Sequence, residues 1–274
     1  MKLSVTSWSF PLLALREVGD IAKALGIDAI DVSLFYASGL DKARLLAEPE
    51  GYGEDIRKQL PLPVANYYHL FGAGLADRNL AGPADPQNLV DLKATLRFAK
   101  AVGAPTVFIL PGMINPGQSR GAAIAASAEA LKPMVEAGQQ AGVTVTIEPH
   151  VHGILESVSA TEDMLHRVPG LKIALDLAHF VALGYRQEEI EVLARHAAHV
   201  HLRQARQGLL QEKLENGTIN FPGLFGALRD AGYDGWLAIE YVHQAYMNTV
   251  FDDVLSETVK MRDCFRTWAG QQED

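Results

Sequence analysis

Val143-Thr-Val-Thr-Ile-Glu-Pro149 is the stretch on which the interpretation of this chain depends. Val143, Val145 and Ile147 are β-branched and apolar, as is typical of a buried strand. Pro149 ends the strand, because proline has no N–H group for the ladder. The stretch therefore predicts a buried strand that carries the Glu148 carboxylate at its C-terminal end.

Three other strand-like runs also end in a residue type that binds metal ions. Asp176, His201 and Glu240 each close such a run. With Glu148 they offer three carboxylates and one imidazole. This set suits a hard or borderline divalent ion, with Mn²⁺ first, then Mg²⁺, and with Co²⁺, Zn²⁺ or Fe²⁺ as alternatives. Buried together, the carboxylates need a cation to offset their repulsion and desolvation. Any one of them alone is better explained as a helix cap or as the partner of a surface charge.

Strand-like and helix-like segments alternate along the whole chain. The strand-like runs lie at 2–7, 29–34, 64–69, 106–110, 143–148, 171–176, 198–201 and 236–240. The helical patterns lie at 15–25, 41–60 with a break near 49–53, 85–99, 121–141, 160–168, 188–196, 223–231 and 249–268. This alternation favours a parallel sheet with crossover helices.

The number of elements decides between two α/β folds. A closed (β/α)₈ TIM barrel, which typically takes about 250 residues, accounts for all of them in a single domain, residues 1–274. A doubly wound open sheet is the alternative, but no Gly-x-Gly-x-x-Gly turn follows the first strand. On a barrel, the ends of four sequential strands meet at one mouth, which is where barrel enzymes carry out their chemistry. We therefore predict a TIM barrel.

Composition narrows the class of protein and of partner. The formal net charge of −9 argues against a nucleic-acid-binding surface, which is normally basic. The single cysteine, Cys264, excludes an internal disulfide framework and fits a reducing compartment. Residues 1–8 contain no long apolar run of the kind found in a signal peptide or membrane anchor. We expect a cytoplasmic protein that acts on a small molecule, with no nucleic-acid or membrane partner; a homo-oligomer remains open.

Four segments resemble the xylose-isomerase-like TIM-barrel superfamily. They are Ile-Glu at 147–148, Leu-Asp-Leu-Ala-His at 175–179, Val-His-Leu-Arg at 200–203 and Tyr-Asp-Gly-Trp-Leu-Ala-Ile-Glu at 233–240. That superfamily holds sugar and sugar-phosphate isomerases and epimerases, including the ketose 3-epimerases, and also endonuclease IV. The resemblance covers essentially the whole chain.

The resemblance implies a role for each matching residue. In the epimerases, the residues that match Glu148, Asp176, His201 and Glu240 bind one divalent metal ion, and the two glutamates also move protons. A histidine that matches His179 contacts the substrate, as does an arginine shortly after the metal-binding histidine. Here that arginine would be Arg206, with Arg203 close by.

The chain also departs from these relatives. The ketose 3-epimerases have a substrate-binding glutamate six residues after the first metal-binding glutamate, and Ile154 stands there instead. Endonuclease IV has His-Pro-Gly after the fourth strand, where this chain has Leu110-Pro-Gly. Its later Asp-x-His pair appears here as Glu212-Lys-Leu214. A three-zinc centre is therefore not expected, and the 3-epimerase reaction is not assured.

Four more residues near the strand ends are candidate substrate contacts. His69 ends the third strand, and His150 and His152 would share a side with Glu148 if the chain stayed extended. Trp8 follows the first strand, where it would stack on a sugar face or simply plug the barrel. We interpret three other histidines as ordinary helix or helix-end residues: His166, His196 and His199.

These residues predict a metal-dependent isomerase or epimerase of a small sugar, sugar acid or sugar phosphate. The ion would stabilise an enediolate of the substrate, while Glu148 and Glu240 remove and return its proton. One alternative is a lyase that removes CO₂ or water from an oxidised sugar acid. The other is a metal-stabilised sugar-binding protein, which would not need two carboxylates beside the ion.

Overall fold

A closed barrel of eight strands forms the centre of the protein. The computed structural model describes residues 1–34, 39–245, 249, 251 and 253–272. The strands are β1 (Lys2–Thr6), β2 (Ala29–Ser33), β3 (Val64–Tyr68), β4 (Thr106–Ile109), β5 (Thr144–Ile147), β6 (Lys172–Asp176), β7 (Ala197–Leu202) and β8 (Trp236–Ile239). Each pairs in parallel with the next, and β8 pairs with β1. The prediction of a TIM barrel is confirmed, and an open sheet is excluded.

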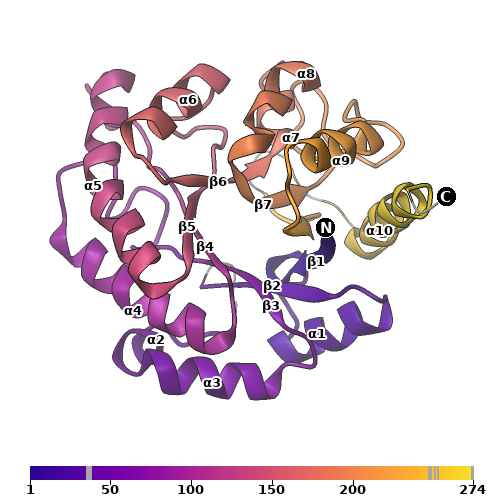
Figure 1. Cartoon of the computed structure of the whole chain (residues 1–274), viewed down its shortest axis with the longest axis horizontal. Coiled ribbons are helices and arrows are strands. Elements are labelled where there is room, and N and C mark those ends of the chain that lie inside the picture. The colour runs from indigo at the N-terminus through magenta and orange to yellow at the C-terminus, as the bar shows by residue number, and fades with distance from the viewer. Residues whose placement is uncertain (35–38, 246–248, 250, 252, 273–274) are drawn as a thin grey trace.

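Helices surround the strands on the outside of the barrel (Figure 1). They are α1 (Leu15–Ala24), α2 (Lys42–Ala47), α3 (Pro49–Gln59), α4 (Pro86–Val102), α5 (Arg120–Ala141), α6 (Val158–Arg167), α7 (Leu177–Ala182), α8 (Gln187–Ile190), α9 (Phe221–Asp230) and α10 (Val254–Gly270). Two short 3₁₀ helices, η1 (Ser7–Ser9) and η2 (Glu191–His196), complete the set. Across the described part of the chain, no helix combines the length and hydropathy that a bilayer span requires.

Three helices differ from the sequence-based expectation. The helical pattern at 41–60 breaks at Glu48, because a residue before proline avoids the α conformation. The pattern at 188–196 forms a single α turn followed by 3₁₀ helix. The last helix begins at Val254, where the Asp253 side chain accepts the Ser256 N–H and caps it.

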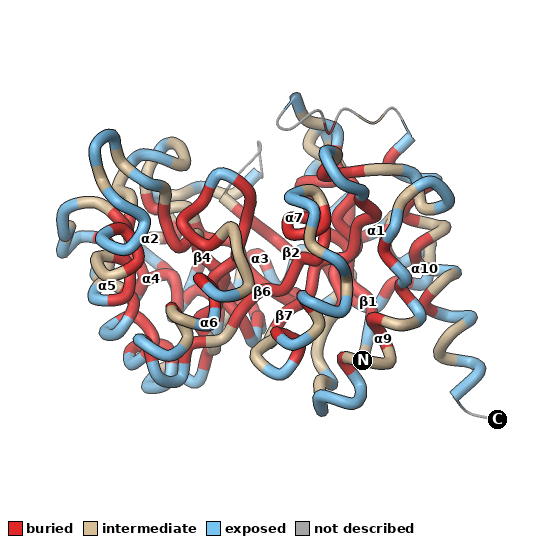
Figure 2. Tube along the Cα trace, turned by 90° about the horizontal axis from the view of Figure 1, so that it is seen from above, coloured by how far each residue is buried: buried red, intermediate tan, exposed pale blue. Residues whose placement is uncertain are grey.

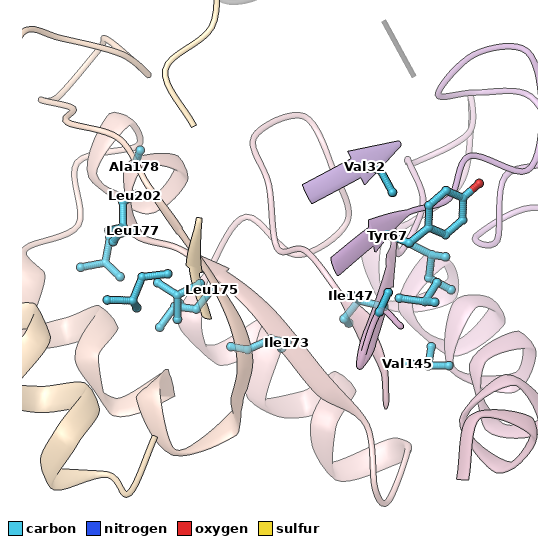
Figure 3. Packing of buried hydrophobic residues seen from close by; sticks show 14 of the residues in the cluster. Val32, Tyr67, Val145, Ile147, Ile173, Leu175, Leu177, Ala178 and Leu202 are labelled. Carbon is cyan, nitrogen blue, oxygen red and sulfur yellow. The ribbon is translucent and has the colours of Figure 1, made fainter. Parts of the chain in front are cut away.

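Alternate side chains of the strands point to opposite sides of the barrel wall. Val145 and Ile147 on β5, and Leu175 on β6, belong to the large apolar cluster that the helices cover. Figure 3 labels members of this cluster on five strands. Ala174, the neighbour of Leu175, belongs instead to a small cluster with Trp8, Tyr68, Phe108 and Val242. Because side chains alternate along a strand, Glu148, Asp176, His201 and Glu240 share the inward side.

A buried polar layer lies inside the barrel. The Asp31 carboxylate accepts hydrogen bonds from Ser4 Oγ at 2.7 Å and from Asn66 Nδ2 at 3.2 Å. Its Oδ2 lies 2.6 Å from His199 Nε2. His199 is therefore no helix-end residue: it lies on β7, fully buried. The buried residues, coloured red in Figure 2, lie along the strands and inner helix faces. They include these polar residues as well as apolar ones.

Two glycines of α3 provide a test of how tightly the helix layer packs. A Cβ at Gly53 would lie 2.7 Å from the Ala101 Cβ and 2.8 Å from the Phe98 carbonyl oxygen on α4, whereas Gly51 has nothing within 4 Å. Gly53→Ala should lower the free energy of unfolding by about 1–3 kcal/mol through overpacking. Gly51→Ala should raise it by about 0.5–1 kcal/mol through helix propensity. Urea denaturation measures both, and equal effects would contradict the close α3–α4 contact.

Candidate metal centre

Four buried side chains converge at the C-terminal ends of the strands. Glu148, Asp176, His201 and Glu240 each offer one ligand atom, and these atoms all lie within 4.8 Å of one another. They come from the ends of β5, β6, β7 and β8. Strand alternation places each of them inward, so the barrel itself assembles the group. This cluster is consistent with a divalent metal ion.

The contacts within the cluster leave one carboxylate oxygen without a hydrogen bond to the described residues. His201 Nδ1 lies 2.7 Å from Glu148 Oε1 and 3.3 Å from Glu240 Oε2. Trp8 Nε1 donates to Glu240 Oε1 at 2.7 Å, which holds that carboxylate in place. Glu240 Oε2 is buried, and no hydrogen bond to it is found among the described residues. A divalent ion would satisfy this oxygen, so the residues present fit such an ion.

The pKa shifts of the clustered residues show how their charges are compensated without a metal ion. Burial alone would lower the pKa of His201, but the carboxylates of Glu240 and Glu148 outweigh it and raise the pKa to about 10. Burial raises the pKa of Glu148, opposed by His201. Burial likewise raises the pKa of Asp176, opposed by Arg203. In the metal-free cluster His201 therefore keeps a proton that a free imidazole would lose near neutral pH.

Arg203 supplies a permanent cation beside the cluster. Its Nε and Nη2 donate to Asp176 Oδ2 at 2.9 and 2.6 Å. Its Nη2 also lies 2.9 Å from His179 Nε2 and 3.4 Å from Glu240 Oε2. Burial would lower the pKa of Arg203, but Asp176 and Glu240 outweigh it and raise the pKa. The guanidinium thus stays charged although only 6% of Arg203 is exposed.

His179 lies on a helix, where the sequence suggested a loop. Asp176 ends β6 and at once caps α7, because its Oδ1 accepts the Ala178 N–H at 2.8 Å. The first turn of α7 then places His179 3.6 Å from Asp176 Oδ2. The short helix was missed because six residues show too little periodicity to be distinguished from a loop.

A small pocket of about 70 Å³ opens beside the cluster. Among the predicted residues, its lining includes Glu148, Glu240, Trp8, His150, His179 and Arg203. Its other lining residues are Tyr68, Leu75, Phe108, Leu110, Leu210, Val242 and Gln244. Tyr68 and Phe108 stack with ring centroids 4.2 Å apart and give the pocket an apolar wall. Sequence reasoning missed this wall, although both rings lie on the inward side of their strands, as Glu148 does.

His150 and His152 do not share a side. His150 Nδ1 donates to the carbonyl oxygen of its neighbour Val151 at 2.7 Å, and the chain then turns, with His152 at a φ of 63°. His152 is exposed, and its N–H donates to Glu156 Oε1 at 2.7 Å. The extended backbone that would have brought the two histidines together is therefore absent at this point.

Two more predicted substrate contacts lie outside the pocket lining. His69 Nδ1 is 3.1 Å from Thr95 Oγ1, and burial lowers the pKa of His69 to about 3, so it is a neutral core histidine. Arg206 is half-exposed, and its Nε donates to Glu212 Oε2 at 3.0 Å. Arg203, two residues beyond His201 on the inward side, takes the buried position instead.

Comparison with known proteins gives a family and a fold. A family model described as "Xylose isomerase-like TIM barrel" matches residues 19–260. A human protein named "Putative hydroxypyruvate isomerase" is 28% identical over 168 residues, 55% of this chain and 58% of that protein. A 2-oxo-tetronate isomerase from Pectobacterium atrosepticum is 22% identical over 160 residues, 55% of this chain and 60% of its own length. The chain thus matches less than two thirds of either relative.

Solved structures resemble the chain over nearly its whole length. One described as a D-tagatose 3-epimerase-like protein superimposes with a TM-score of 0.73 at 18% identity and covers 99% of both chains. Another, described as the probable 3-DHS dehydratase AsbF from Bacillus anthracis, has a TM-score of 0.70 at 17% identity and covers 96% of this chain and 99% of its own. At these identities the likeness shows the fold alone.

Metal binding to this cluster should release protons. The pKa of about 10 means that His201 is protonated near neutral pH, and a metal-binding nitrogen cannot keep that proton. Metal affinity should therefore rise about tenfold per pH unit between about pH 6 and 8. Calorimetric titration with Mn²⁺ in two buffers of different ionisation enthalpy measures the protons released. An affinity independent of pH would contradict the assignment of His201 as a ligand.

Proposed function

Because the chain belongs to the xylose isomerase-like TIM barrel family, we propose that it is a divalent-metal-dependent isomerase or epimerase. Its substrate would be a small sugar, sugar acid or sugar phosphate that reacts through an enediolate. The observation that carries the proposal is the presence of two buried glutamates, Glu148 and Glu240, in one cluster with Asp176 and His201. The isomerases named among its relatives support the reaction type.

The four clustered residues would hold the metal ion, with Mn²⁺ as the first candidate because three of the four ligands are carboxylates. When bound, the ion would supply Lewis-acid stabilisation of charge on the substrate oxygens. Mg²⁺, Co²⁺, Zn²⁺ and Fe²⁺ are the alternatives that a metal analysis would separate. The depth of the cluster keeps bulk water away from a reactive enediolate.

The two glutamates would move the proton. In an isomerisation, one carboxylate takes the proton from the hydroxyl-bearing carbon, the neighbouring carbonyl carbon receives a proton, and the hydroxyl proton passes to the former carbonyl oxygen. In an epimerisation, the other carboxylate returns a proton to the same carbon from its opposite face. Trp8 donates to Oε1 of Glu240 and so orients this carboxylate, whose Oε2 makes no hydrogen bond with the described residues. Burial raises the pKa of Glu148 toward the range that suits a general acid.

Four of the predicted substrate contacts are supported by their place in the pocket lining. They are His179, Arg203, His150 and Trp8. Their mixture of donors and one flat aromatic ring suits a small polyol with several oxygens. His69, His152 and Arg206 receive no such support, because the partners described above hold them elsewhere.

A lyase is the second candidate function. The observation that favours it is the buried guanidinium of Arg203 in the pocket lining, which suits a carboxylate that would leave as CO₂ or stay beside a departing hydroxyl. A solved structure of the same fold is described as a probable dehydratase, which is consistent with elimination chemistry in this fold. Incubation with sugar acids and analysis for CO₂ or a dehydrated product would separate the two.

Metal removal tests whether the activity requires a divalent ion. Dialysis against EDTA should abolish turnover of any substrate found by screening ketoses, sugar acids and their phosphates. Mn²⁺ or another divalent ion should restore it. Because the ion binds only the folded cluster, adding it at about 100 times its dissociation constant should raise the free energy of unfolding by about 2.7 kcal/mol. Full activity in metal-free protein would refute the mechanism.

Glu240→Gln tests proton transfer separately from folding. Glutamine keeps the size and an acceptor for Trp8 Nε1, but it cannot take a proton. Turnover should fall by about 10²-fold or more, and so should deuterium incorporation from solvent into the substrate. Metal content is measured in the same samples, because the new amide group would face the other ligands. Glu162→Gln, on the outer surface of α6, is the matched control and should change neither quantity.

A further inference from the structure

His201 belongs to two groups of buried side chains. Its Nδ1 lies 2.7 Å from Glu148 Oε1 and 3.3 Å from Glu240 Oε2, so this nitrogen faces the candidate metal centre. One of its nitrogens also lies within 4.8 Å of a nitrogen of His199 and an oxygen of Asp31. Both of these residues are fully buried. His201 therefore connects the prospective ligands to the polar layer inside the barrel.

The second ring nitrogen of His201 has no hydrogen-bond partner among the residues that the structure describes. This nitrogen, Nε2, is also buried. If Nδ1 binds a metal ion, the neutral imidazole keeps its proton on Nε2. That proton then needs an acceptor, because an unpaired buried N–H group is destabilising. Histidines that bind metal ions usually donate this second N–H to a neighbouring acceptor, which fixes the tautomer and the orientation of the ring.

His199 has a nitrogen that can serve as this acceptor. Its ring centroid lies 5.2 Å from that of His201, at an interplanar angle of 84°. Two other rings pack against His201, those of Phe108 and Trp8, with centroids 5.2 and 6.2 Å away. Phe108 has no nitrogen or oxygen in its side chain, and the Trp8 N–H can only donate, which it does to Glu240. Of these three neighbouring rings, His199 alone can accept a hydrogen bond at nitrogen.

Asp31 determines which nitrogen of His199 is the acceptor. Its Oδ2 lies 2.6 Å from His199 Nε2, a distance at which two lone pairs would repel, so Nε2 carries a proton. The N–H is not aligned with the carboxylate, and the contact is electrostatic. In a neutral His199, Nδ1 is then the acceptor. Nδ1 is buried and makes no hydrogen bond within the described part of the chain.

The Asp31 carboxylate is itself held by hydrogen bonds from other strands. Ser4 Oγ on β1 donates to its Oδ1 at 2.7 Å, and Asn66 Nδ2 on β3 donates to its Oδ2 at 3.2 Å. Thr106 Oγ1 on β4 donates in turn to Asn66 Oδ1 at 2.8 Å. Asp31 therefore offers His199 a fixed point of attachment in the barrel wall.

We propose that His199 and Asp31 are positioning residues for the metal ligand His201. When Nδ1 of His201 binds the ion, its Nε2–H donates to His199 Nδ1, directly or through one water molecule, and the Nε2–H of His199 donates to Asp31. Nitrogens of the two rings approach within 4.8 Å, a separation that either arrangement can bridge. This inference rests on the proposed function, which requires the ion, and adds the residues that select Nδ1 as the ligand atom.

His199→Phe is the decisive variant. Phenylalanine keeps a ring in the barrel interior but has neither the N–H nor the acceptor. The dissociation constant for Mn²⁺, measured by calorimetry without substrate, should rise about 10- to 100-fold, the usual effect of losing the group behind a metal-binding histidine. Unchanged Mn²⁺ affinity in folded His199→Phe would overturn the proposal.

His69→Phe is the matched control for the loss of a buried histidine. His69 is 1% exposed and lies outside both groups that contain His201. Its replacement should leave the Mn²⁺ dissociation constant unchanged. Equal weakening by the two phenylalanine variants would indicate a general effect of the core and would count against a positioning role for His199.

His199→Gln separates hydrogen bonding from packing. The amide group has a donor for Asp31 and an acceptor for His201, although it lacks the ring. Its Mn²⁺ dissociation constant should lie closer to that of the unchanged protein than to that of His199→Phe. An affinity as low as that of His199→Phe would mean that the ring matters and the hydrogen bonds do not, contrary to the proposal.

Nitrogen NMR of histidine-labelled protein reads the tautomer of His201 directly. Zn²⁺ is the probe ion, because paramagnetic Mn²⁺ broadens nearby signals. In the Zn²⁺-loaded protein, His201 should show a metal-bound Nδ1 and a protonated Nε2 whose proton resonates downfield, as hydrogen-bonded imidazole protons do. That proton should move upfield in His199→Phe. A metal-bound Nε2, or a proton signal that His199→Phe leaves in place, would contradict the assignment.

None of these measurements needs a substrate, so the proposal and the proposed function fail separately. Mn²⁺ binding that depends on His199, in a protein that turns over no sugar or sugar acid, would refute the proposed function alone. Failure of the unchanged protein to bind any divalent ion would refute both.

Discussion

Three buried carboxylates held around one imidazole are the constraint on which the C-terminal end of this barrel depends. Their ligand atoms lie within 4.8 Å of one another. Mutual repulsion and lost hydration would each favour an open arrangement unless positive charge is present. The protein supplies part of that charge itself through Arg203, and part through the proton on His201. A divalent ion would replace the proton while Arg203 remains.

Ordinary strand geometry is enough to bring these four side chains together. Each clustered residue lies at the end of a strand, and the residues next to it in sequence face the helices. The same alternation of side chains therefore places apolar residues outside the barrel and polar residues inside it. Val145 and Ile147 contribute to the outer cluster, while Glu148, one residue further, turns inward. Beneath this level, Asp31 and His199 form a second polar layer whose members bond mainly to one another. The site thus rests on paired polar groups as well as on hydrocarbon.

The sequence predicted what depends on strand period and strand ends. The closed barrel and the convergence of Glu148, Asp176, His201 and Glu240 are of this kind. It did not predict features set by local turns: the left-handed backbone at His152, which separates it from His150, or the six-residue helix that carries His179. Arg203 and Arg206 were not ranked from sequence, because both follow β7, which ends at Leu202. The structure buries Arg203 and leaves Arg206 half-exposed.

Asp176 has two tasks, and this limits how the site can change over evolutionary time. One oxygen of its carboxylate ends β6 by capping α7, and the other binds Arg203 beside the prospective ligands. Replacement by alanine would remove the cap, the ion pair and a ligand in one mutational step. Asparagine would keep the cap and the side-chain size while giving up the charge. A lineage that abandoned metal chemistry would therefore pass most easily through asparagine here, retaining the helix and a recognisable barrel after the activity had gone.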